Sequence, residues 1–179
     1  MTEQELDRAF SEKLTSSKEF CTWLLRQTKF HDAAEKAILL VQEQANARPK
    51  VKSENWWRHW WCKLPDGSES ETDVLAVFGF HESDYRIAIH IEDKPPHGKF
   101  TPNQYLNYEP RAKFMANNSK FMNYSDFATM LLAPESFVAA NADKVINFER
   151  VITYEDLSQL IPEFGQSLLN ANLGATTKK

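Results

Sequence analysis

Residues 85–96, YRIAIHIEDKPP, restrict the possible folds more than any other stretch of this chain. Apolar residues alternate with others along it, which predicts a half-buried β-strand, and the two prolines end that strand because proline lacks the amide donor of a β-ladder. Side chains two residues apart lie on the same face of a strand. The three isoleucines are therefore expected to face a core, while Glu92 and Lys94 leave the strand together on the opposite face.

The composition favours one domain in a reducing compartment. A chain of 179 residues can bury a core without disulfide bonds, and Cys21 and Cys62 form neither a disulfide framework nor a Cys-x-x-Cys metal pair. The opening residues, MTEQELDR, are too polar for a secretory signal, and the longest apolar runs, such as residues 37–41, are too short to cross a bilayer. We therefore expect a cytoplasmic protein without membrane contact.

Helical patterns come first along the chain. Leu6, Phe10 and Leu14 share a helical stripe, and Asp32 with Glu35 resembles a capping box at the start of a third helix. The predicted helices cover residues 3–14, 17–28 and 32–47.

Three strands on short turns follow in the centre of the chain. The turn Pro-Asp-Gly at residues 65–67 joins the first two, because proline and glycine suit its dihedral angles. Consecutive strands on short turns form an antiparallel meander. The predicted strands cover residues 56–63, 71–79 and 85–92.

The rest of the chain alternates helices with strands. Thr101-Pro102 opens a crossover helix, which Pro110 is expected to kink or divide. The later elements are predicted as a strand over 127–133, a helix from residue 134, a strand near 146–152 and a helix near 154–161.

These elements together predict an α/β fold with a mixed central sheet flanked by helices. All of them fit within a single domain. Its parts are predicted as a helical extension (1–30), a core (31–135) and a C-terminal strand–helix tail (136–179).

The meander brings chemically active side chains together. Its second strand runs antiparallel to the third, so Asp73 at the start of one lies beside Glu92 and Lys94 at the end of the other. The two carboxylates and the backbone carbonyl of Asp93 form a hard-oxygen site suited to Mg²⁺ or Mn²⁺. A lysine beside the metal can position or deprotonate a water, or stabilise transition-state charge.

Two helices are expected to add to this site. The crossover helix starts shortly after Lys94, so Gln104 and Tyr108, one turn apart, should overlook it. If the third helix packs antiparallel to the first strand, its N-terminal turn lies near the site. That packing favours Glu35 as a third acidic ligand over the other glutamates of the region.

The order Asp73, then Glu92-x-Lys94, then Gln104-x-x-x-Tyr108 resembles the motifs of the PD-(D/E)XK nuclease superfamily, particularly its RecB-like branch. The motif acids of that family carry over to Asp73 and Glu92, its lysine to Lys94, and its QxxxY motif to the last two residues. The resemblance implies a restriction-endonuclease-like αβββαβ core and Mg²⁺-dependent phosphodiester hydrolysis.

Three details qualify this resemblance. It covers about residues 30–135 and leaves the first two helices and the tail outside. The first-helix acid of the family carries over to Glu35, and Thr72 stands where the motif name has proline.

Each motif residue also has a structural interpretation. Glu92 and Lys94 can form a solvated ion pair worth about 0–1 kcal/mol. Gln104 can complete a capping box with Thr101, and Asp73 can be a turn residue.

Two further residues are candidates for substrate binding. Tyr108 is assigned to it through the motif, although a tyrosine on a helix often belongs to the core. His90 shares the face of Glu92, and it is either a hydrogen-bonded core histidine or a contact to substrate. The side chain of Asp93 points to the other face by strand parity and is expected to be structural.

The stretch WWRHWW at residues 56–61 allows two interpretations. Aromatic side chains on both faces favour a strand that is covered on both sides. An open face would instead offer base stacking worth about 1–3 kcal/mol per base. We favour the core. Possible phosphate contacts in the chain are Arg58, Lys63, Lys99, Arg111 and Lys113.

The leading hypothesis is therefore a metal-dependent nuclease acting on nucleic acid, DNA rather than RNA, with Asp73, Glu92, Lys94 and Gln104 as catalytic residues. The formal net charge of −4 argues against a nucleic-acid binder but does not exclude one, because a carboxylate site is itself acidic. The alternatives are an inactive nuclease-fold module for binding or assembly, and a hydrolase of another phosphoester. The oligomeric state, a homodimer included, stays open.

Overall fold

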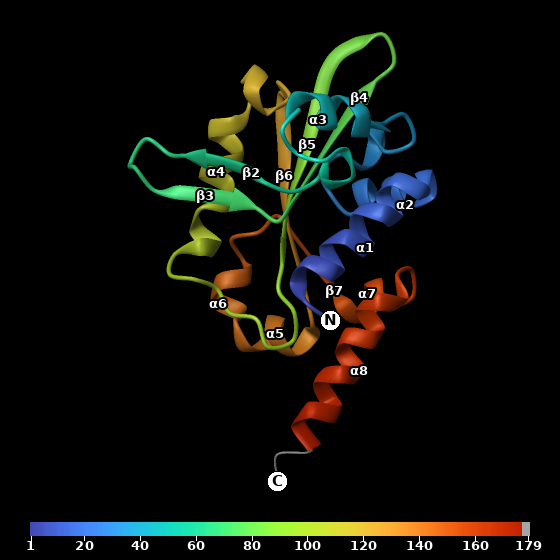
Figure 1. The fold of residues 1–179 in the computed structure, drawn as a ribbon, viewed down its shortest axis with the longest axis vertical. Helices are drawn as coiled ribbons and strands as arrows, with labels where there is room; N and C mark the ends of the chain where they lie inside the picture. Colours follow the sequence, from blue (N-terminus) through green and yellow to red (C-terminus); the bar gives the residue numbers. More distant parts are fainter. Residues whose placement is uncertain (177–179) are drawn as a thin grey trace.

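A five-stranded mixed sheet forms the centre of the structure, a computed structural model that describes residues 1–176 (Figure 1). The strand order is β1-β4-β5-β6-β7. The β1–β4 and β4–β5 pairs are antiparallel, whereas β5–β6 and β6–β7 are parallel. The strands are β1 (Ile38–Leu39), β4 (Val74–Phe80), β5 (Ser83–Asp93), β6 (Asp126–Ala133) and β7 (Arg150–Thr153).

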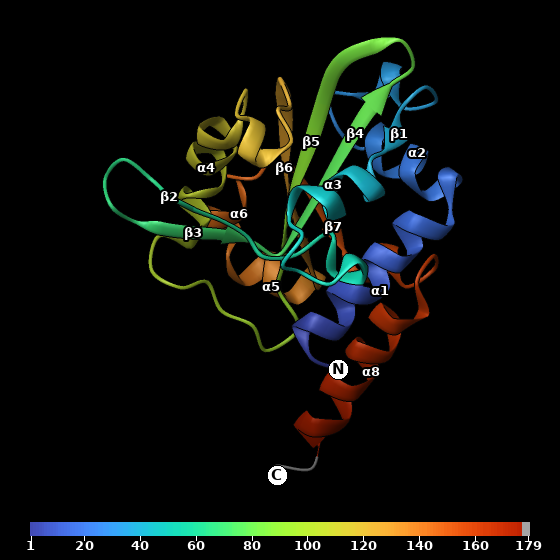
Figure 2. The same ribbon diagram turned by 45° about the horizontal axis from the view of Figure 1, so that its top comes forward.

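Helices cover both faces of this sheet, as Figures 1 and 2 show. The helices on one face are α1 (Glu3–Ser16), α2 (Lys18–Arg26), α7 (Tyr154–Leu157) and α8 (Pro162–Thr176). The helices on the other face are α4 (Tyr108–Met115), α5 (Glu135–Ala140) and α6 (Ala142–Val145). The prediction of an α/β fold with a mixed sheet flanked by helices is therefore confirmed.

The strand parity predicted for β5 is also confirmed. Ile87, Ile89 and Ile91 all belong to the core between the sheet and α1, where none of them is exposed. Ala88 faces the smaller core on the α4 side. The backbone of β5 therefore directs Glu92 to the α4 face and Asp93 to the α1 face.

The N-terminal helices belong to the main core. Thr2 and Glu5 form a capping box at the start of α1, and Leu6, Phe10 and Leu14 are buried against the sheet. These two helices were expected to be an extension outside the core. They instead form one of its two helical layers.

The helix predicted over residues 32–47 is wrong. The chain forms a 3₁₀ turn, η1 (His31–Ala33), then the edge strand β1, and only then a short helix, α3 (Val41–Ala47). The edge of β4 explains the difference, because its backbone groups need partners. The amide of Leu40 donates to Val77 O at 2.9 Å, and the side chain of Gln44 bonds the backbone of Leu75 and Val77.

The tryptophan-rich segment does not join the central sheet. After the turn η2 (Ser53–Asn55), the strand β2 (Trp60–Lys63) pairs with β3 (Glu69–Thr72) in a separate two-stranded sheet. The predicted strand 71–79 is thus two strands that change partner at Asp73. The first strand of the antiparallel meander is β1 rather than residues 56–63.

The segment after β5 contains less α-helix than predicted. A 3₁₀ turn, η3 (Gln104–Leu106), precedes α4, and a second one, η4 (Ser119–Phe121), precedes β6. Pro110 is the third residue of α4 and leaves it intact, because amides in the first turn of a helix have no intrahelical acceptor. In the described part of the chain, no helix is long and apolar enough to cross a membrane.

Candidate active site

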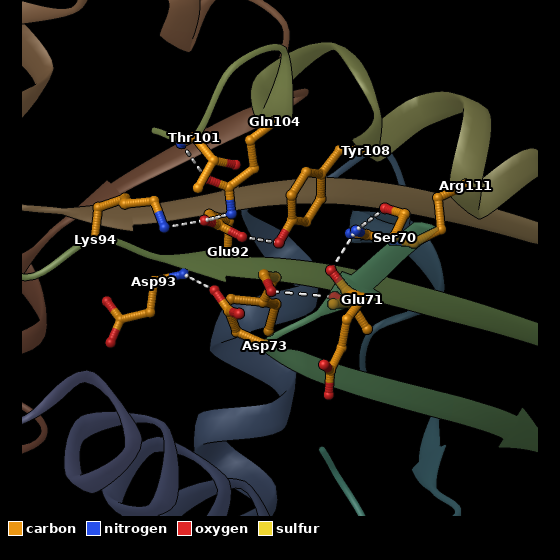
Figure 3. Close-up of polar contacts among 12 residues, drawn as sticks. Ser70, Glu71, Asp73, Glu92, Asp93, Lys94, Thr101, Gln104, Tyr108 and Arg111 are labelled. Atoms are coloured by element: carbon orange, nitrogen blue, oxygen red, sulfur yellow. Dashed lines mark hydrogen bonds and ion pairs between the residues drawn. The ribbon is translucent and has the colours of Figure 1, made fainter. Parts of the chain in front are cut away.

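Asp73 lies where the chain leaves the small sheet and enters the central one. It separates β3 from β4, and the antiparallel register of β4 and β5 places it beside the end of β5. Its Oδ2 atom accepts a hydrogen bond from the backbone amide of Asp93 at 2.9 Å (Figure 3). The structure therefore brings Asp73 together with Glu92 and Lys94, as the meander geometry predicted.

The carboxylate of Glu92 is fully buried and is held by three side chains. Its Oε1 atom is paired with the Lys94 ammonium and accepts a hydrogen bond from Gln104 Nε2 at 2.5 Å, and its Oε2 atom accepts one from the Tyr108 hydroxyl (Figure 3). Burial raises the pKa of Glu92 well above its ordinary value, and Asp73 raises it further, while Lys94 opposes both. The three donors fix the orientation of this carboxylate.

Gln104 and Tyr108 reach Glu92 from two separate short elements. Gln104 also accepts a hydrogen bond from the Thr101 amide at 3.0 Å, so its capping contact and its contact with Glu92 occur together. Tyr108 is fully buried and packs against Phe148. Its hydroxyl orients Glu92, and the side chain is not accessible to a substrate.

Lys94 is almost completely buried beside the carboxylates. Burial alone would lower the pKa of Lys94, but the charges of Glu92 and Asp73 offset that effect and hold the pKa above its ordinary value. A general base needs a depressed lysine pKa. In the arrangement described by this structure, Lys94 is therefore a cation rather than a base.

The side chain of Asp93 points to the opposite face, as strand parity predicted (Figure 3). Its Oδ1 atom accepts a hydrogen bond from the Tyr154 hydroxyl at 2.5 Å. Its Oδ2 atom and Oδ1 of Asp7 are buried and have no hydrogen-bond partner within residues 1–176. Burial raises the pKa of both carboxyl groups well above their ordinary values, and their mutual repulsion raises that of Asp7 further.

Two acids from α1 belong to this site, and the sequence patterns did not single them out. Glu3, Asp7 and Asp73 line one cavity of about 370 Å³. Burial and then the charge of Asp73 raise the pKa of Glu3. A signal was present in the sequence, because Glu3 and Asp7 are spaced four residues apart and extend the stripe that continues to Phe10 and Leu14.

Glu35 is not part of the site, which corrects the prediction of a third metal ligand at this position. It is exposed, pairs with Arg26 at 2.5 Å, and lines a different cavity together with Lys18 and Trp23. The helix that was expected to carry it toward the site does not form. The acids of α1 occupy the neighbourhood that was assigned to Glu35.

His90 is a core residue, which corrects its assignment to substrate binding. It is fully buried, its Nε2 lies 2.9 Å from the Tyr124 hydroxyl, and its ring contacts Phe127. Burial lowers the pKa of His90 well below its ordinary value, so the ring is neutral at pH 7. Of its two sequence interpretations, the hydrogen-bonded core histidine is the one that the structure supports.

The basic residues considered as phosphate contacts differ in their accessibility. Arg111 is buried, lies 3.8 Å from the Tyr108 ring centroid, and donates to Ser70 Oγ at 2.8 Å. Lys113 is exposed on α4 and pairs with Glu109. Arg58 lines the cavity of Asp73, so it is the best placed of these residues to meet a phosphate.

The donor groups at this site fit a hard divalent cation. Five carboxyl groups (Glu3, Asp7, Asp73, Glu92 and Asp93) interact with one another, whereas Lys94 is the one ammonium acting on Glu3, Glu92 and Asp93. Among residues 1–176, no group of three or more His, Cys, Asp or Glu side chains is already arranged to hold a metal ion. Mg²⁺ commonly takes only one or two protein carboxylates and completes its shell with water and substrate phosphate. Asp73 and Glu92 meet that requirement.

A metal bound through Glu92 requires a rearrangement of its present contacts. Both carboxylate oxygens already receive donors from the chain itself. Lys94, Gln104 or Tyr108 would therefore have to give up its contact with Glu92 before that carboxylate could bind a metal. Comparisons with protein-family models, with curated proteins and with solved structures found no match.

Proposed function

We propose that this protein is a metal-dependent nuclease that hydrolyses phosphodiester bonds in DNA, with Mg²⁺ or Mn²⁺ as its cofactor. The observation that carries the proposal is the meeting of Asp73, Glu92 and Lys94 at one end of the β4–β5 pair. A simple surface ion pair is excluded as an explanation, since Glu92 is fully buried and oriented by Gln104 and Tyr108.

The arrangement of the elements supports a restriction-endonuclease-like core. The order α1, β1, β4, β5, α4, β6 follows the pattern αβββαβ, with an antiparallel meander and then a crossover to a parallel strand. Asp73 precedes the second strand of this core, and Glu92 and Lys94 end the third. The hairpin of β2 and β3 is then an insertion between its first two strands.

The residues of the site have separate roles in this proposal. Asp73 and Glu92 would hold the metal, which when bound supplies a Lewis acid that offsets charge on the scissile phosphate and activates a water. Gln104 and Tyr108 keep Glu92 in position. Lys94 acts as a cation toward the phosphate, because its raised pKa keeps it protonated.

One observation favours the alternative of an inactive module with the same fold. Three donors from the chain already satisfy Glu92, so this carboxylate needs no metal as a partner. A module would need no divalent cation, whereas a nuclease binds one through Asp73 and Glu92. Metal binding therefore separates the two functions.

The test is digestion of plasmid and linear DNA with Mg²⁺, Mn²⁺ or EDTA, together with calorimetric titration of Mg²⁺ and Mn²⁺. The wild-type protein should cleave with either metal and not with EDTA, and Asp73→Ala should lose both cleavage and metal binding. Asp84→Ala, at the exposed start of β5, is the matched control and should behave like the wild type. Absence of metal binding in the wild type would favour the module, and cleavage that persists in Asp73→Ala would refute the assigned site.

A further inference from the structure

The hairpin of β2 and β3 has one buried and one exposed face. Trp60 and Cys62 are buried on one side, whereas Trp61 and Lys63 point to the other. Of the four tryptophans in residues 56–61, Trp61 is the exception to burial, with 44% of its surface exposed. The core interpretation therefore holds for three of them and leaves Trp61 without an explanation.

The exposed face of the hairpin continues into the proposed active site. Trp61 is the cross-strand partner of Glu71 on β3, and Asp73 follows Glu71 by two residues, just beyond the end of that strand. Two residues along a strand and one step across it correspond to about 7 Å and about 5 Å, so the Cα atoms of Trp61 and Asp73 are expected roughly 9 Å apart. Glu71 and Asp73 also line the same cavity.

The walls of that cavity come from the segment that precedes the hairpin and from α1. Trp57, Arg58 and His59 face Glu3 and Asp7 across it. His59 is held by its Nδ1 contact with Glu71 at 3.1 Å. A substrate strand with its phosphate at Asp73 would therefore leave this cavity over the exposed face of the hairpin, where Trp61 lies.

We propose that Trp61 is a stacking platform for a base next to the scissile phosphate, and that the substrate is consequently DNA with unpaired bases at the cleavage site. This inference rests on the proposed nuclease function. An indole offers its face to any base, but a base inside a duplex is stacked on both sides and is not available to it. The platform thus selects a single strand or a frayed end.

The charges around Trp61 support a contact with bases rather than with phosphates. Its neighbours on the exposed face are Lys63, Glu69 and Glu71, of which two are acidic. Such a surface attracts the phosphate backbone of neither a duplex nor a single strand, so binding at this position would have to come from stacking of a base on the indole. The part of the binding free energy that Trp61 contributes by stacking should accordingly change little with salt, unlike the part that comes from contacts with phosphates.

The test measures binding of a fluorescein-labelled oligothymidylate of about 16 nucleotides and of a blunt duplex of equal length, by anisotropy with Ca²⁺ in place of Mg²⁺. Trp61→Ala should weaken single-strand binding roughly 5- to 150-fold, and Trp61→Phe should retain most of it. Duplex binding should not change. Tyr85→Ala is the matched control, because Tyr85 is 42% exposed at the other end of β5.

The outcomes separate this inference from the proposed function. Single-strand binding that is unchanged in Trp61→Ala, or that falls equally for duplex, overturns the platform even if the wild type cleaves DNA. A wild type that binds no oligothymidylate overturns it as well. If the wild type fails to cleave with Mg²⁺ but binds single strands through Trp61, Trp61 stands as a single-strand contact, and the nuclease function fails together with the scissile phosphate beside it.

Discussion

The two ends of β5 carry the same kinds of charged groups in opposite arrangements. At its start, Arg86 pairs with Glu43 at 2.6 Å, and Lys29 pairs nearby with Asp126 at 2.7 Å; all four side chains are partly exposed. At its end, five carboxyl groups interact with one another, most of them buried, and Lys94 is paired with one of them, Glu92. At the start of β5, each charged group has an exposed partner of opposite charge. At its end, the carboxyl groups outnumber the cations and most of them are buried.

This difference separates exposed ion pairs, which matter little to stability, from buried carboxyl groups, which need an explanation beyond stability. Exposed pairs gain little free energy and lose little when they are removed. Buried carboxyl groups with raised pKa values cost free energy, and chains tolerate such groups mainly where they bind ligands or catalyse reactions. The comparison therefore predicts large functional and stability effects at the end of β5 and small ones at its start.

The largest effect is expected from Lys94→Ala. If Lys94 has the proposed role of a cation facing the scissile phosphate, its removal should lower the DNA cleavage rate by at least about 100-fold, as for other losses of an electrostatic contact in a transition state. The fold should persist, because Glu92 can take up a proton when its partner is lost. The measurements are the cleavage rate in Mg²⁺ and the circular dichroism spectrum at 25 °C.

The control for this prediction is Lys29→Ala, which removes a lysine near the start of β5. It should cleave at the wild-type rate. Equal losses of cleavage rate in both variants would mean that cleavage depends on the total positive charge of the protein. The two ends of β5 would then not differ in function.

A smaller effect is expected from Asp7→Asn, which should raise the stability of the fold. The pKa of Asp7 is raised by burial and by Asp93, so the folded state disfavours its charge. A raised pKa means that stability is lost as pH rises above the unfolded value of about 3.9, because the unfolded state then binds fewer protons. Without metal, Asp7→Asn should therefore be more stable than the wild type at pH 7 by about 1–2 kcal/mol, and equally stable near pH 4.

Urea denaturation at the two pH values, with EDTA present, measures this difference. Glu12→Gln changes an exposed acid of the same helix and serves as the control, with an expected change below about 0.5 kcal/mol. If Asp7→Asn were less stable than the wild type at pH 7, the carboxylate would be a stabilising structural group, and its place in a functional site would have to be withdrawn.

The parts of the site that follow from strand geometry could be predicted from the sequence. Period-two alternation separated Glu92 from Asp93, and the antiparallel turn placed Asp73 beside them, because both depend on backbone geometry within a few residues. The QxxxY spacing brought Gln104 and Tyr108 to Glu92 even though they lie on separate elements. In each of these cases, short connections left the chain few alternatives.

The parts that depend on how distant elements pack could not be predicted. Residues 32–47 have a helical pattern, but two of them form β1 and pair with the edge of β4. Pairing with the sheet therefore outweighs the local helix propensity. The acids Glu3 and Asp7 reach the site only because α1 crosses the end of β5. No local pattern states which helix covers which strand end.

The smallest effect is expected from Glu43→Gln, beside the start of β5. It removes the charge that Arg86 faces but leaves an amide oxygen that still accepts its hydrogen bond. Because Glu43 is half exposed, the free energy of unfolding should fall by only about 0–1 kcal/mol, and the loss should shrink further in high salt. Urea denaturation at low and high ionic strength measures both quantities. A loss as large as the gain expected for Asp7→Asn would show that the exposed ion pairs matter as much to this fold as the buried carboxyl groups. The contrast between the two ends of β5 would then no longer identify a functional site.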